Sequence, residues 1–159
     1  MGSIVVRFIK SAGLVSDLIA GATDSLFDHA EFGTPEGTWI GAHDDGGVQE
    51  RAANYCNPWR EYVYSIPCTD EQEASLLAWA RGKIGTPYNF EDIAGLLFHS
   101  WKLNNPKADI CSQFCCLGLL QIFGAARVLN VLEARTFLIT PEILHLSPIF
   151  VGNRTKAVG

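Results

Sequence analysis

The order of the strand-like and helix-like segments constrains the fold of this 159-residue chain more than any other feature. Its first half contains short runs that are rich in β-branched and aromatic residues or alternate in polarity, which predicts strands and extended segments. These runs are residues 3–10, 28–34, 38–44, 47–55 and 60–68. Helical patterns dominate the second half. Strands that precede helices predict an α+β domain, with an antiparallel sheet packed against helices.

Capping signals mark the helices. Thr69 and Gln72 stand three residues apart, the spacing of a capping box, at the start of a helix predicted over residues 69–85. Acidic residues fill its first turn, and Gly85 is placed to end it. A short helix or an irregular connection is expected at residues 13–25. Further helices are predicted over residues 89–103, 111–123 and 140–147.

Length and charge limit the classes of partner. A chain of 159 residues with 48% apolar and 18% charged residues predicts a single globular domain over residues 1–159. Its net charge of -5 argues against nucleic acid, because phosphate binding needs clustered Lys and Arg. No run of about 18 uninterrupted apolar residues occurs, so no membrane span is expected. The N-terminus lacks a signal-peptide pattern, which favours the cytoplasm. The oligomeric state is left open.

The cysteines do not form a recognisable framework. The five cysteines are an odd number with no regular spacing, which favours reduced thiols in a cytoplasm. A zinc site would need two paired Cys or Cys–His knuckles, and these spacings do not supply them. No metal and no other cofactor is therefore expected. The cysteines are Cys56, Cys68, Cys111, Cys115 and Cys116.

One cysteine occupies a chemically distinctive position. Cys111 lies at the predicted start of a helix, where unpaired N–H groups and the helix dipole stabilise a thiolate. The same N–H groups can bind the oxyanion formed when a thiolate attacks a carbonyl. Cys115 and Cys116 lie inside the helix among apolar residues and suit a packing role. Position alone favours an inert thiol at Cys111 as well, so a base is needed to support catalysis.

The histidines supply two candidate bases. His29 and His43 flank the predicted hairpin, whereas the other two histidines lie in predicted helices. Glu31 follows His29 by two residues, so in a strand both side chains point to the same face. A carboxylate there could orient the imidazole as the third member of a catalytic triad does. The alternative is a solvent-facing His/Glu pair on a sheet.

Taken together, these residues resemble the circularly permuted branch of the NlpC-like, papain-related cysteine peptidases and amidases. The motifs that carry the resemblance span about residues 25–148. They are the histidine strand and hairpin "FDHAEFGTPEGTWIGAHDDGGVQER", the segment "GTPYNF", the helix start "DICSQFCCLGLL" and the closing element "TPEILHLSP". The resemblance implies a papain-like fold, Cys111 as the nucleophile and His29 as the base. It also implies substrate contacts from Tyr88 and from Ser112, which follows the nucleophile.

Two positions depart from the pattern of the family. Gln113 stands where relatives commonly have Glu, and Gly41 stands where they often have the third polar group of the triad. Either Glu31 or His43 takes over the orienting role, or the site works as a Cys–His dyad. Glu31 is preferred because strand geometry sets its relation to His29. His43, which lies nearer the exit of its strand, is then expected to contact the substrate.

The resulting hypothesis is a cysteine hydrolase that cleaves an amide bond, with a peptide or a peptidoglycan fragment as the substrate that the family implies. An isolated domain of this kind suits a phage-encoded or prophage-encoded protein or an intracellular hydrolase. One alternative is a lipid acyltransferase or thioesterase of the same fold. The other is a catalytically inactive structural or assembly protein, which the departures at Gly41 and Gln113 favour.

Overall fold

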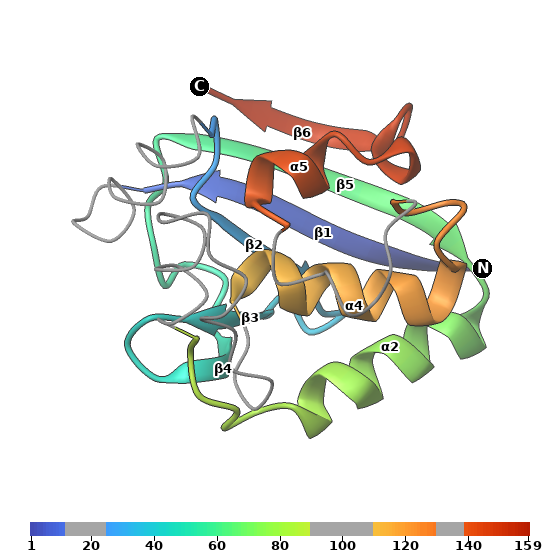
Figure 1. The fold of residues 1–159 in the computed structure, drawn as a ribbon, viewed down its shortest axis with the longest axis horizontal. Helices are drawn as coiled ribbons and strands as arrows, with labels where there is room; N and C mark the ends of the chain where they lie inside the picture. Colours follow the sequence, from blue (N-terminus) through green and yellow to red (C-terminus); the bar gives the residue numbers. More distant parts are fainter. Residues whose placement is uncertain (12–24, 90–109, 130–138) are drawn as a thin grey trace.

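The computed structural model describes residues 1–11, 25–89, 110–129 and 139–159, and in this part of the chain it shows an α+β fold (Figure 1). The described strands form one six-stranded antiparallel sheet with the order β4-β3-β2-β1-β5-β6. They are β1 (Gly2–Lys10), β2 (His29–Gly33), β3 (Trp39–His43), β4 (Gly47–Arg51), β5 (Arg60–Cys68) and β6 (Arg154–Val158). The helices are α2 (Asp70–Gly82), α4 (Cys111–Phe123), α5 (Pro141–His145) and the 3-10 helix η3 (Pro148–Phe150). The predicted α+β class is confirmed.

Most of the predicted segments form the expected elements. Strands β1 to β5 form within or over the segments expected from alternation and β-branched content, although β4 ends four residues before its expected segment does. The hairpin of β2 and β3 pairs Phe32 with Ile40. The sequence pattern does not predict β6, because this strand is exposed along its whole length and lacks apolar alternation. The segments expected at residues 13–25 and 89–103 fall almost entirely outside the described residues.

Local hydrogen bonds explain the helix boundaries. The Thr69 side chain accepts from the backbone N–H of Gln72 at 3.2 Å, and the Gln72 side chain accepts from the backbone N–H of Thr69 at 3.0 Å. This reciprocal capping box begins α2 as predicted. The helix ends at Gly82, three residues before Gly85, where a φ of +92° leaves the helical region. Helix α4 begins at Cys111 and ends before Gly124, the range predicted from its pattern.

Strand alternation divides the residues of the sheet between two faces. One face carries buried apolar side chains, including Phe32 of β2, whose ring lies 5.6 Å from that of Phe114 in α4. Trp79 of α2 stacks on Phe114 at 5.2 Å, so both longer helices pack on this face. Burying a side chain of this size contributes roughly 1.5–3 kcal/mol. The opposite face carries polar side chains of β1, β2 and β3, which build the candidate site.

Two further features of the described structure are the character of its helices and the state of its cysteines. Within the described ranges, no helix has both the length and the apolar character needed to cross a membrane. All five cysteines are free thiols in the structure, three of them buried and two partly exposed. Cys111, at the start of α4, is therefore not tied up in a disulfide.

Candidate active site

Cys111 is the first residue of α4, and that end of the helix lies against the hairpin of β2 and β3 (Figure 1). The preceding residue, Ile110, has no polar side-chain atom that could cap the first turn. The thiol is 2% exposed, and its Sγ lies 3.7 Å from the backbone carbonyl oxygen of Asp28. The sulfur is therefore buried at the N-terminal end of α4, where the backbone N–H groups of the first turn lie.

His29 lies beside this sulfur. It is the first residue of β2 and directly follows Asp28, so its ring lies at the end of the sheet where α4 begins. Burial lowers the pKa of His29, but its interactions with Cys111 and then with the Glu31 carboxylate raise it to about 10. A pKa in this range describes an imidazolium at neutral pH. The structure thus brings the two predicted catalytic residues, Cys111 and His29, together.

Glu31 and His43 complete the cluster. Glu31 is fully buried, which excludes the solvent-facing alternative, and its Oε2 lies 3.6 Å from Nε2 of His29 and 3.9 Å from Nε2 of His43. The two imidazole rings are 4.6 Å apart. Burial and the adjacent His29 charge lower the pKa of His43 to about 3. The two histidines are therefore held in different charge states, with the proton on His29, an assignment typical of acid–base sites.

A buried arginine stabilises the charge of Glu31. Arg7 of β1 is the cross-strand partner of Glu31, and its Nε donates to Oε1 at 2.7 Å. The Tyr55 hydroxyl donates to the same carboxylate at 3.1 Å from Oε2 and 3.2 Å from Oε1. Trp39 packs on the guanidinium, with its ring centre 4.1 Å away. Burial alone raises the pKa of Glu31, but His29 and Arg7 together lower it below its usual value.

The sequence motifs did not reveal Arg7 or Tyr55 as part of the site. Strand β1 is otherwise apolar between Ile4 and Ile9, so a single arginine inside it was a usable signal for a buried charge. Its partner could not be identified, because the pairing of β1 with β2 is set by the sheet and not by sequence spacing. Tyr55 lies between β4 and β5, in a segment without a regular pattern.

Gly41 has a steric role in the cluster. A Cβ at this position of β3 would lie 2.9 Å from Cβ of Glu31, 3.1 Å from Nε2 of His29 and 3.4 Å from Cε1 of His29. The first distance is shorter than side chains tolerate. The absence of a side chain at Gly41 therefore leaves the space that the His29 ring occupies.

The structure places Tyr88 and Ser112, two of the residues expected to contact the substrate, in different surroundings. Tyr88 lies near the thiol, since burial, followed by the charge of Cys111, raises the pKa of its hydroxyl well above the usual value. Ser112 is fully buried, and its hydroxyl donates to the carbonyl oxygen of Ile139 at 2.5 Å. This bond anchors α4 to the segment that leads into α5, and the substrate contact expected of Ser112 stays a prediction. Gln113 is also buried.

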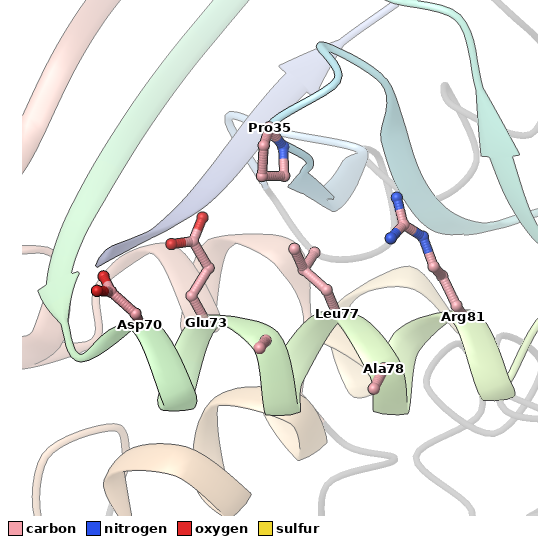
Figure 2. A pocket seen from close by; sticks show the side chains of 7 residues that line it. Pro35, Asp70, Glu73, Leu77, Ala78 and Arg81 are labelled. Carbon is pink, nitrogen blue, oxygen red and sulfur yellow. The ribbon is translucent and has the colours of Figure 1, made fainter. Parts of the chain in front are cut away.

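A surface groove along α2 lies apart from the cluster, between the helix and Pro35 (Figure 2). Its polar groups already have partners. Asp70 pairs with the N-terminal amine at 3.2 Å, Glu73 accepts from the Ser3 N–H at 3.3 Å, and Arg81 pairs with Glu36 at 3.0 Å. These contacts hold α2 against the sheet, and the groove contributes no residue to the candidate site.

Three side chains of the cluster also have the composition of a metal site. One ligand atom each from His29, Glu31 and His43 lies within 4.8 Å of the other two. Cysteine spacing could not reveal this set, because its members come from two strands that meet only through sheet pairing. Two imidazoles and a carboxylate are donors that suit zinc and related transition metals.

Comparison with known proteins identifies the fold but not a family. No protein-family model matches the chain, and no curated protein is significantly similar to it. Among solved structures, the metalloprotein YiiX from Escherichia coli O157:H7, also described as DUF1105, has a similar fold. The two agree with a TM-score of 0.65 and 16% sequence identity, over 99% of this chain and 96% of that one. The chain therefore shares its overall fold with this E. coli protein.

Proposed function

We propose that this protein is a cysteine hydrolase with a papain-like, permuted NlpC-like domain. The observation that carries the proposal is the pairing of the Cys111 thiol, at the start of α4, with the His29 imidazole, at the start of β2. A buried carboxylate, Glu31, lies behind the imidazole. Nucleophile, base and orienting group thus follow one another in space, the relation that defines a catalytic triad.

The proposed reaction cleaves an amide in two steps. The Cys111 thiolate attacks the carbonyl carbon, and the C–N bond breaks as His29 gives its proton to the departing amine. A thioester remains on Cys111. His29, now neutral, takes a proton from water, whose oxygen attacks the thioester and releases the acid. The proton on His29 and the thiolate of Cys111 are thereby regenerated.

The neighbouring residues have distinct roles in this scheme. Nε2 of His29 faces Glu31, so we assign proton transfer to the other ring nitrogen, Nδ1. The backbone N–H groups at the start of α4 are placed to bind the oxyanion. The Tyr88 hydroxyl, near the thiol, is a candidate second donor. His43 lies within the cluster as a neutral imidazole and orients the carboxylate from the other side.

Peptide amides are the proposed substrates, and peptidoglycan-type peptides are the first choice within that class. The negative net charge of -5 does not suit nucleic acid. Free thiols suit the reducing cytoplasm in which we place the protein, as a phage-encoded or an intracellular hydrolase. A lipid acyltransferase of the same fold would use the same pair, and esters of lipids test that alternative. Gly41, which leaves room for the base, weakens the argument for an inactive assembly protein.

Selective alkylation of the thiols tests the proposal before a substrate is known. Iodoacetamide modification, followed by peptide mass spectrometry, is expected to label Cys111 faster than the more exposed Cys68, because the thiolate is the reactive form. His29→Ala should remove this difference. Labelling of Cys111 that is no faster than labelling of Cys68 would contradict a catalytic thiolate.

The fold shared with YiiX extends the proposal in one direction. That protein is named a metalloprotein. The donor atoms of His29, Glu31 and His43 are also suited to a metal ion.

A further inference from the structure

Two buried ring nitrogens at the site have no hydrogen-bond partner among the residues that the structure describes. They are Nε2 of His29 and Nε2 of His43. The His43 side chain is only 6% exposed, so bulk water does not satisfy its nitrogen. A buried polar atom without a partner costs about 1–3 kcal/mol, and such an atom in a folded protein needs an explanation. Two such atoms in one cluster mark a position where a ligand could bind.

Both nitrogens face the same carboxylate oxygen. Oε2 of Glu31 lies 3.6 Å from the His29 nitrogen and 3.9 Å from the His43 nitrogen, too far for good hydrogen bonds. Zinc bonds of about 2.0–2.1 Å in a tetrahedral site place neighbouring donor atoms roughly 3.4 Å apart. The two separations from Oε2 are therefore close to those that surround a metal ion, and all three donor atoms lie within 4.8 Å of one another.

The surroundings of Glu31 direct one carboxylate oxygen, which also accepts from the Tyr55 hydroxyl at 3.1 Å, toward the two histidines. Its Oε1 is held by the Arg7 guanidinium, while Oε2 faces the two histidines. The Tyr55 hydroxyl donates to both oxygens of the carboxylate. Residues that fix the orientation of a ligating carboxylate in this way are a regular part of metal sites. The carboxylate is thus positioned to offer Oε2 and is not free to turn away.

We propose that His29, Glu31 and His43 bind one divalent transition-metal ion of the zinc class. We further propose that this ion and the catalytic pair exclude one another. With a metal on Nε2, the His29 ring keeps its one proton on Nδ1 and has no free lone pair to accept another, so His29 cannot act as the base of Cys111 and the metal-bound protein is inactive. This second part rests on the proposed hydrolase function, whereas the binding site itself does not. Two nitrogen donors disfavour Mg²⁺, which prefers oxygen.

Calorimetric titration with ZnCl₂ and with MgCl₂ tests the site on the full chain. Wild type is expected to bind one Zn²⁺ and no Mg²⁺. His43→Ala and His29→Ala should each weaken Zn²⁺ binding by about 100-fold or more, since even outer partners of metal ligands change affinity 10–100-fold. Cys68→Ser, which removes a more exposed thiol, should bind as wild type does. Unchanged binding in both histidine variants, or loss of binding in Cys68→Ser, would overturn the site.

Alkylation in the presence of Zn²⁺ tests the exclusion. Labelling of Cys111 in the wild type is expected to slow at least about 10-fold with bound Zn²⁺ and to recover with a chelator, while labelling of Cys68 stays unchanged. Equal slowing of both thiols would show general thiol binding and overturn the exclusion. Selective labelling without Zn²⁺ binding would refute the metal site and leave the hydrolase. Zn²⁺ binding without selective labelling at any metal level would refute the hydrolase and leave the metal site.

Discussion

Replacing Gly41 with Ala tests whether the proposed catalytic base, His29, needs the space that this glycine leaves. The added Cβ would lie 2.9 Å from Cβ of Glu31 and 3.1 Å from Nε2 of His29. The Cβ atom of Glu31 is fixed by the backbone of β2, which is paired on both sides, so it cannot move freely. The His29 ring therefore has to move. Overpacking costs about 1–3 kcal/mol, while replacing a strand glycine with alanine recovers about 0.5–1 kcal/mol. We expect a net loss of stability of roughly 1 kcal/mol.

The expected effect on catalysis is much larger. A displacement of about 1 Å at a catalytic group can cost about 100-fold in rate. Gly41→Ala should therefore lower kcat/KM on a cleaved peptide amide by about 100-fold, or the alkylation rate of Cys111 by a similar factor. Urea unfolding monitored by circular dichroism should show that the fold is kept, with the modest loss of stability worked out above.

Gly33→Ala is the matched control. Gly33 lies on β2, and a Cβ there would meet Cζ3 of Trp39 at 2.9 Å and Cγ1 of Val5 at 3.0 Å, a comparably tight contact away from the catalytic pair. Gly33→Ala should lower the free energy of unfolding by a similar amount. It should leave kcat/KM, or the alkylation rate of Cys111, within about 3-fold of wild type, because neither Trp39 nor Val5 is a reacting residue. Equal rates for Gly41→Ala and Gly33→Ala would refute the steric argument.

Three further predictions follow from the same cluster. Glu31→Gln should lower the free energy of unfolding by about 3 kcal/mol in urea titrations, because it leaves the buried Arg7 charge without its main partner; a loss below about 1 kcal/mol would contradict this. Cys111→Ala should abolish turnover, whereas Cys115→Ala should keep the rate within about 2-fold and lower only stability, by about 1 kcal/mol or more. The raised pKa of His29 stabilises the fold fully below pH 6.5, and this contribution should be lost as the pH rises from 6.5 to about 10. His29→Gln should remove that dependence in unfolding curves measured across this range, and an unchanged curve would refute the assignment.

Local signals predicted most of the secondary structure. The capping box of Thr69 and Gln72, and the range of α4 before Gly124, depend on residues within a few positions of one another. The strands of the hairpin are similarly local, because alternation and turn residues are read within one segment. Strand β6 was missed because an exposed edge strand carries no apolar alternation and forms only through its pairing with β5.

The candidate site combines both kinds of information. The sequence by itself determined that Cys111 begins a helix, and that His29 and Glu31 share one face of a strand, because both follow from helix and strand geometry. Only the tertiary structure decided that Arg7 pairs with Glu31 and that Gly41 makes room for the imidazole. Those relations depend on the register between strands and on the packing of α4 at the end of β2. Interactions between residues distant in the chain set both, and no local pattern encodes them.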